Sequence, residues 1–293
     1  MDRKFSIAHL TALECTPPEL IYIAAKTGYD FVSLRPIAMG LPSEPRYDLY
    51  NDKKLKSETK AAFSETGMKL LDIELAKIYD GMNARDYLPA FEVAAELGAK
   101  HVLSSIWSDD HHYAIDQFGE VCDLANQFGL TVELEFVPIA SVKTLKGAID
   151  ILETVNRANA GLMIDLHHFH RSKDKIEDLK LVHDRYFKYF HLCDCSGETP
   201  KTEEELIRIM REERLYAGEG GVNIAGIVAS LPPNLPCSIE LPNKKRSEEL
   251  GYEEYARRCL AAAKEYLANY TGKEMPRTSS ITGMNTKYAS GFF

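Results

Sequence analysis

Residues 127–135 read QFGLTVELE, and this stretch joins the end of a helical segment to the start of a strand. Glycine suits the left-handed position after a helix, because it has no β-carbon to clash there. The following TVELE has the β-branched and apolar residues of a buried strand. The same arrangement recurs in KTGYDFVSL (26–34), ETGMKLLDI (65–73) and ELGAKHVLS (96–104). These recurrences indicate one periodic domain.

Strand-like runs alternate with helix-length segments along the whole chain. The eight runs are FSIAHL (5–10), FVSLRP (31–36), KLLDIELAKI (69–78), HVLSSIW (101–107), LTVELEF (130–136), LMIDL (162–166), YFHLCD (189–194) and CSIEL (237–241). We expect helices over 17–27, 52–66, 88–97, 112–128, 144–159, 174–185, 203–213 and 252–269. Strict alternation predicts parallel strands joined by crossover helices.

The predicted fold is therefore α/β, a single (β/α)8 TIM barrel with a C-terminal extension. Such a barrel needs about 250 residues, which assigns 1–269 to the barrel and 270–293 to an extended or subunit-docking tail. An open doubly wound sheet would usually carry a glycine-rich phosphate loop after its first strand, and IAHLTALECTPPEL (7–20) has none. We also expect a homo-oligomer.

The composition of the chain argues against nucleic acid and membranes as its partners. The hydrophobic fraction of 45% allows a full core, and the net charge of −9 argues against nucleic acid as a partner. No apolar run approaches the roughly 20 residues of a membrane span, and the first residues lack the apolar core of a signal peptide. We expect a cytoplasmic protein with no membrane partner, whose six cysteines are reduced thiols.

Four metal-ligating residues stand where four successive predicted strands end: Glu135, Asp165, His191 and Glu240. The carboxyl ends of barrel strands share one rim, and alternate side chains point inward. Three carboxylates and one imidazole suit a divalent cation, with Mn²⁺ favoured and Mg²⁺, Co²⁺ or Zn²⁺ also compatible. Glu133 faces the same interior one layer deeper, and we expect it to pair with a basic side chain of another strand.

These motifs resemble those of the xylose-isomerase-like superfamily, which contains sugar isomerases and epimerases, endonuclease IV, inosose-processing enzymes and 3-dehydroshikimate dehydratase. The ketose 3-epimerase members have a D-x-x-H motif on strand 6, matched by Asp165 and His168. A histidine ends strand 7 there, as His191 does here. An arginine also precedes a G-x-G loop, as Arg214 precedes LYAGEG (215–220).

The resemblance implies a metal-dependent isomerase or epimerase of a sugar, ketosugar or cyclic polyol that works through an enediolate. Glu135 and Glu240 would bind the metal and transfer protons on opposite sides of a substrate carbon. His168 would donate to a substrate oxygen, and Arg214 would hold a hydroxyl or an anionic group. Further pocket candidates at the ends of strands 1 to 4 are His9, Arg35, Glu74 and Trp107, of which Arg35 and Glu74 could simply pair.

Several alternatives stay open at this point. The epimerases carry another glutamate six residues after the strand-5 ligand, where this chain has Ser141. A lyase or dehydratase of a keto-sugar or cyclitol could use the same metal site. An endonuclease IV-like phosphodiesterase is disfavoured, because residues 196–225 lack its Asp-x-His pair, and a non-catalytic subunit would not need four intact ligands. Asn243, Lys244 and Lys245 form either a phosphate-binding loop or a solvated turn.

Overall fold

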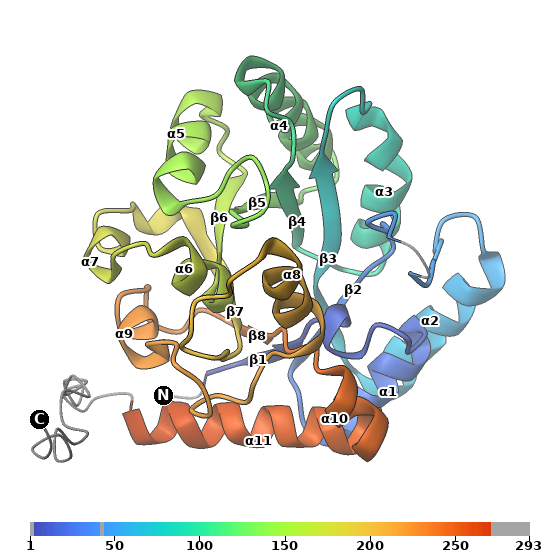
Figure 1. Ribbon diagram of the computed structural model, residues 1–293. Helices are drawn as coiled ribbons and strands as arrows, with labels where there is room; N and C mark the ends of the chain where they lie inside the picture. The colour runs from blue at the N-terminus through green and yellow to red at the C-terminus, as the bar shows by residue number, and fades with distance from the viewer. Residues whose placement is uncertain (1–2, 42–43, 271–293) are drawn as a thin grey trace, which may run out of the picture.

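The computed structural model describes residues 3–41 and 44–270. Within these ranges eight parallel strands follow one another around a closed barrel (Figure 1). The strands are β1 (Phe5–Ile7), β2 (Phe31–Leu34), β3 (Lys69–Ile78), β4 (His101–Ile106), β5 (Thr131–Glu135), β6 (Ala160–Asp165), β7 (Phe187–Leu192) and β8 (Cys237–Ile239). The predicted (β/α)8 barrel is confirmed.

The strand register brings the predicted ligands to one rim. Ser105 of β4 lies beside Glu135 of β5, and Asp165 of β6 lies beside His191 of β7. His191 in turn lies beside Ser238 of β8, two residues before Glu240. Because all these strands are parallel, their carboxyl ends meet at the same end of the barrel.

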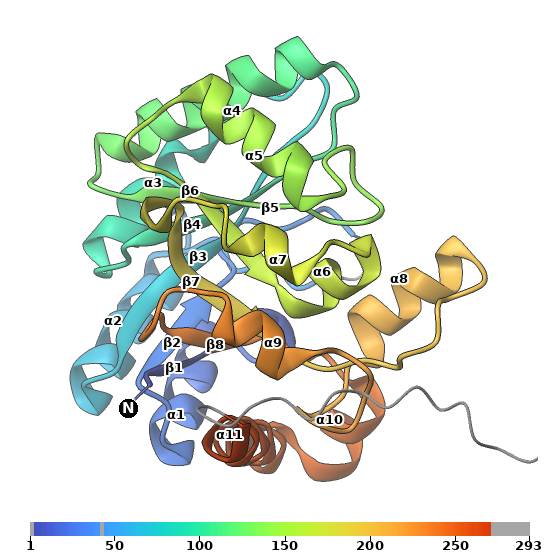
Figure 2. The same ribbon diagram turned by 90° about the vertical axis from the view of Figure 1, so that its left-hand side faces the viewer.

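Long helices form the outer layer around the strands (Figures 1 and 2). They are α1 (Pro17–Thr27), α2 (Lys53–Thr66), α3 (Leu88–Glu96), α4 (His111–Asn126), α5 (Leu145–Val155) and α11 (Tyr252–Tyr270). Helix α8 (Glu203–Glu212) lies instead at one end of the barrel. Gly28 and Gly67 end α1 and α2 in the left-handed conformation, with φ of 87° and 69°. The recurring glycines thus mark helix ends, as the sequence predicts.

Shorter helices differ most from the sequence prediction. The helix expected over 174–185 is wrong: only α7 (Ile176–Leu179) and the 3-10 helix η3 (Asp184–Tyr186) form there. The segment between them leaves Leu181 84% exposed, so no continuous apolar face holds a longer helix against the barrel. Two other 3-10 helices are η1 (His9–Ala12) and η2 (Ala84–Tyr87).

Three further short helices lie in the loops that follow β6, β7 and β8: α6 (Leu166–Ser172), α9 (Ile224–Ala229) and α10 (Lys244–Leu250). Each begins after a capping side chain, namely Asp165, Asn223 and Asn243. Lys244 and Lys245 therefore belong to the exposed first turn of α10 rather than to a loop. Figure 2 shows α8 projecting from the barrel on the same side as α6 and α10.

Three further expectations concern the tail, a membrane span and the cysteines. The barrel's last helix includes Tyr270, and the rest of the expected tail, 271–293, lies outside the described residues. Across 3–41 and 44–270, no helix is both long and apolar enough to cross a membrane. The six cysteines are all buried free thiols.

Candidate metal centre

The four predicted ligands converge at the carboxyl rim of the barrel. One potential ligand atom from each of Glu135, Asp165, His191 and Glu240 lies within 4.8 Å of all the others. The His191 Nδ1 atom is 3.6 Å from Oε2 of Glu240 and 3.8 Å from Oε1 of Glu135 and Oδ2 of Asp165. These separations exceed a hydrogen bond and leave room for an ion between the atoms.

The chemistry of this cluster fits a divalent cation. Glu135 Oε1 and both ring nitrogens of His191 are buried, and no residue in the described part of the chain forms a hydrogen bond with them. Buried polar atoms without partners are rare in folded proteins, because each costs desolvation energy. Three carboxylate oxygens and one imidazole nitrogen around a common point are a suitable ligand set for such an ion.

Arg214 supplies the positive charge that the protein itself provides to this cluster. Its Nη1 atom lies 2.6 Å from Oδ2 of Asp165 and 2.9 Å from Oε2 of Glu240. Its Nε donates to the carbonyl oxygen of Met210 at 2.9 Å, and the side chain is 1% exposed. One guanidinium cannot neutralise three carboxylates, so either protons on the cluster or a bound cation must balance the remaining charge.

The protein groups alone therefore take unequal protonation states. Burial, with the charges of Glu240 and Asp165, raises the pKa of Glu135 well above its ordinary value. Burial opposes ionisation of Glu240 too, but His191 and Arg214 outweigh it and hold its pKa well below the usual range. Burial also works to lower the pKa of His191, yet Glu240, Glu135 and Asp165 raise it to about 10.

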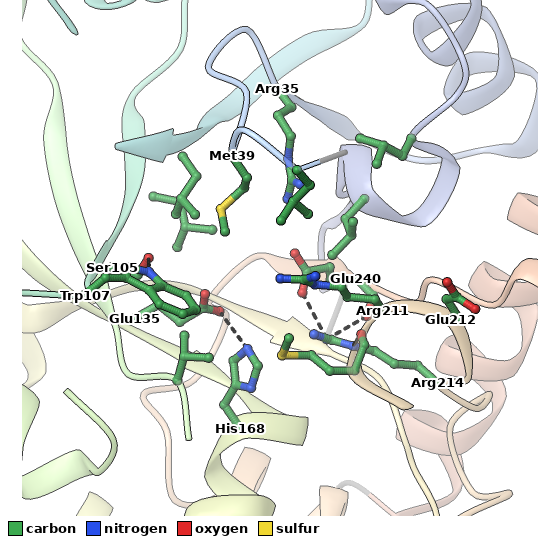
Figure 3. A pocket seen from close by; sticks show the side chains of 17 residues that line it. Arg35, Met39, Ser105, Trp107, Glu135, His168, Arg211, Glu212, Arg214 and Glu240 are labelled. Atoms are coloured by element: carbon green, nitrogen blue, oxygen red, sulfur yellow. Dashed lines mark hydrogen bonds and ion pairs between the residues drawn. The ribbon is translucent and has the colours of Figure 1, made fainter. Parts of the chain in front are cut away.

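A cavity of about 310 Å³ opens onto two of the four residues, Glu135 and Glu240. Asp165 and His191 lie beneath it, at 1% and 0% exposure. The full lining is Leu10, Leu13, Arg35, Met39, Leu41, Leu75, Leu103, Ser105, Trp107, Glu135, Val137, His168, Met210, Arg211, Glu212, Arg214 and Glu240 (Figure 3). The cluster is therefore accessible through its two glutamates.

A family model described as a xylose isomerase-like TIM barrel matches residues 21–263. The chain belongs to this family.

Named relatives share parts of this barrel. An inosose isomerase of Bacillus licheniformis is 30% identical over 151 residues, which are 48% of this chain and 52% of that protein. The match thus spans about half the length of that relative. An inosose isomerase of Bacillus velezensis is 25% identical over 240 residues, covering 75% of this chain and 81% of its own. The crystal structure of an IolI protein with a bound zinc atom superposes with a TM-score of 0.73 at 22% identity, covering 92% of this chain and all of that one.

In the present protein, His168 and Trp107 lie in the wall of the cavity. His168 Nε2 lies 4.0 Å from Oε1 of Glu135, as the dashed line in Figure 3 shows. Burial lowers the pKa of His168 to about 4, so its imidazole is neutral at pH 7. The Trp107 indole Nε1 donates to Ser105 Oγ at 2.8 Å, while the Lys77 ammonium lies 4.7 Å from the ring centroid.

The other candidates from the first half of the barrel bind one another. Arg35 Nε and Nη2 both donate to Oε2 of Glu74, at 3.0 and 2.8 Å. His9 Nε2 donates to the carbonyl oxygen of Cys15 at 2.9 Å, and Nδ1 accepts from the amide of Arg35 at 2.9 Å. Arg35 lines the cavity, whereas the lining side chains do not include His9 or Glu74. The suggested pairing of Arg35 with Glu74 is thus what the structure contains.

Glu133 and Ser141 have structural partners. His101 Nδ1, on β4, lies 3.4 Å from Oε1 of Glu133, so the expected pairing with a basic side chain from another strand is confirmed. Ser141, at the position of the epimerases' additional glutamate, donates to Oδ1 of Asp109 at 2.7 Å. Neither Glu133 nor Ser141 lines the cavity.

Sequence reasoning missed two functional features near the rim. Arg211 and Met210, at the end of α8, line the cavity. Asp194 accepts hydrogen bonds from the amides of Cys195, Gly218, Gly220 and Val222 at 2.8 to 3.0 Å, and so anchors the loop after Arg214. The sequence signal for Asp194 is its place three residues after His191, just beyond the end of β7. At Gly220 a β-carbon would collide with the Cys195 carbonyl oxygen.

Proposed function

We propose that this chain is a divalent-metal-dependent isomerase or epimerase that acts on a ketosugar or a keto derivative of a cyclic polyol through an enediolate. One observation carries this proposal. Four ligating side chains converge within 4.8 Å, and two of them, Glu135 and Glu240, also face a cavity of about 310 Å³. The named relatives, both inosose isomerases, support a sugar-like substrate.

Glu135, Asp165, His191 and Glu240 would hold the ion, which when bound would supply positive charge to stabilise a substrate enediolate. Glu135 and Glu240 come from β5 and from the end of β8, so they approach a molecule in the cavity from different sides. One carboxylate removes the proton from the carbon beside the carbonyl, and the other returns a proton. Asp165 and His191 are shielded from the cavity and serve as ligands.

In this scheme neutral His168 donates a hydrogen bond to a substrate oxygen, because its Nε2 atom faces Glu135 and both side chains line the cavity. Arg214 keeps Asp165 and Glu240 ionised and fixes their orientation. The oxygen-rich ligand set favours Mn²⁺, while the zinc in the IolI structure makes Zn²⁺ the first competitor. Metal analysis of protein purified without added ions decides between them.

The reaction is tested by proton exchange. Metal-loaded protein is incubated in D₂O with ketoses and with inososes, and deuterium is followed at the carbon beside the carbonyl. We expect exchange with at least one substrate, and a mass-neutral product apart from deuterium. No exchange over the whole panel, with the metal bound, contradicts the proposal. A product that has lost water assigns the same site to a dehydratase instead.

The matched variants are Glu135→Gln and Glu96→Gln. Glu96 lies on the outer surface, where its Oε1 pairs with Lys60 Nζ at 2.8 Å. Glu135→Gln should slow exchange by about 10²–10⁴-fold, whereas Glu96→Gln should match the unmodified protein.

A further inference from the structure

The cavity contains a second polar region, formed by Arg35 and Arg211, above the metal centre. Figure 3 shows both side chains reaching into the cavity from two different walls. Arg35 follows β2, and Arg211 lies in the last turn of α8. The two cations influence each other: the pKa of Arg211 is lowered, by burial first and by the charge of Arg35 second. The buried Glu44 carboxylate acts on both arginines and works to raise the pKa of each, but it forms a hydrogen bond with neither.

Arg35 is only partly satisfied by the protein. Its Nε and Nη2 atoms donate to Glu74, but Nη1 lies 3.7 Å from its nearest carboxylate oxygen, Oε1 of Glu44. That distance is too long for a hydrogen bond, and Glu44 Oε1 is itself without a hydrogen-bond partner in the described chain. One edge of the Arg35 guanidinium therefore remains available to a ligand, at 6% side-chain exposure.

Arg211 lacks a close partner within residues 3–41 and 44–270, although the charges of Glu44 and Glu212 act on it from a distance. Its side chain is half-buried against the cavity, yet none of these residues forms an ion pair or a side-chain hydrogen bond with it. The neighbouring Arg208, one turn earlier, pairs with Glu213 on the outside of the same helix. An arginine that faces a cavity with five unused donors is suited to a planar or tetrahedral oxyanion.

Among the charged groups described at the site, Arg211 is a cation that no carboxylate contacts. Glu74 and, at 3.7 Å, Glu44 face Arg35, while Arg214 and a divalent cation together would balance the three carboxylates of the metal centre. The cavity, at about 310 Å³, is at the small end of the roughly 300–1,000 Å³ typical of ligand sites. A group bound at Arg211 and a carbon held between Glu135 and Glu240 must then belong to one small molecule.

We propose that Arg211, together with the free Nη1 edge of Arg35, binds an oxyanion of the substrate, so that the substrate is a keto-polyol bearing one carboxylate or phosphate. This inference rests on the proposed function for the position of the reacting carbon. Arg211 is a specificity-determining residue here, because it selects the charged molecule and takes no part in proton transfer.

The test compares three cyclic polyols that differ in charge: quinate, myo-inositol 1-phosphate and myo-inositol. Calorimetry on metal-loaded protein should show at least one anionic probe binding about tenfold or more tightly than myo-inositol. A preference for quinate assigns a carboxylate, and a preference for the phosphate assigns a phosphate. Equal affinity for all three probes, or binding of neither anion, overturns the proposal.

The variants are Arg211→Gln and, as a matched control on the same helix, Arg208→Gln. Arg211→Gln should reduce the anionic probe's affinity about tenfold or more while leaving myo-inositol affinity and metal content unchanged. Arg208→Gln should alter none of these. If Arg211→Gln keeps the anion affinity, Arg211 is not the receptor. Metal content and deuterium exchange are measured separately, so a charge preference that depends on Arg211 stands even if the isomerase proposal fails.

Discussion

The two halves of the barrel rim handle their polar residues in opposite ways. On the side of β1 to β4, His9 uses both ring nitrogens within the protein, and Arg35 forms a two-donor pair with Glu74. On the side of β5 to β8, Glu135 Oε1 and both nitrogens of His191 are buried with no hydrogen-bond partner in the described chain. The first half holds its charged groups mainly through internal bonds, although Oε1 of Glu44 has no hydrogen-bond partner there. The second half differs because its unsatisfied atoms are metal-ligating atoms that converge on one point.

The largest effect should follow from Asp165→Asn, on the unsatisfied half. The amide keeps the size of the side chain and its capping oxygen but loses the charge that attracts a cation. Metal affinity should fall by more than about 100-fold, exceeding the effect usual for residues behind the ligands. Metal content after dialysis and far-UV circular dichroism measure the change.

Asp109→Asn is the control for that variant, because Asp109 is exposed on the same rim and bonds to Ser141. It should retain stoichiometric metal. Full metal occupancy in Asp165→Asn would remove this residue from the ligand set.

Glu135→Gln should slow proton transfer without weakening the fold. The loss of a proton-transfer group costs about 10²–10⁴-fold in rate, and deuterium exchange should slow by that amount. The urea midpoint of the metal-free protein should stay the same or rise, because burial and the neighbouring charges oppose ionisation of the carboxylate that the variant removes. An exchange rate within threefold of the unmodified protein would assign proton transfer elsewhere.

Glu74→Gln, on the side of β1 to β4, should destabilise the fold without removing the metal. It leaves the buried Arg35 guanidinium without its counter-charge, which costs about 3–5 kcal/mol of unfolding free energy, whereas metal stoichiometry should be retained. Urea denaturation with metal analysis provides both readings. Glu253→Gln, in an exposed pair with Lys26, should cost no more than about 1 kcal/mol. Loss of metal in a folded Glu74→Gln protein would mean that Glu74 also supports metal binding, so that the two halves of the rim form one site.

The smallest effect, measured per pH unit, is expected in the pH dependence of metal uptake. The pKa of His191 is raised to about 10, so at pH 7 it carries a proton that a cation must displace, and the raised pKa of Glu135 acts in the same direction. Metal affinity should therefore increase with pH between 6.5 and 8.5, by about tenfold per pH unit for each proton released. Competition with a chromophoric chelator measures it. An affinity independent of pH would mean that the ligands are already deprotonated.

Much of the site was predictable because the ligands follow strands. LTVELEF and CSIEL identify β5 and β8 by composition, and a charged residue at the end of each then has a defined rim to occupy. The short helices were not predictable in the same way. The helix expected over 174–185 does not form, because that segment has no continuous apolar face. Helix α6 does form, because the Asp165 side chain caps its first turn.

The sequence by itself determined the barrel and the rim position of Glu135, Asp165, His191 and Glu240, because periodicity and strand ends are local properties. The tertiary structure alone decided which polar groups satisfy one another. Arg35 meets Glu74 across 39 positions of the chain, and Arg214 meets Asp165 across 49. Arg211 enters the cavity although nothing in its own segment indicates a site. Pairing between distant side chains depends on distances of a few ångströms, which only the closed barrel sets.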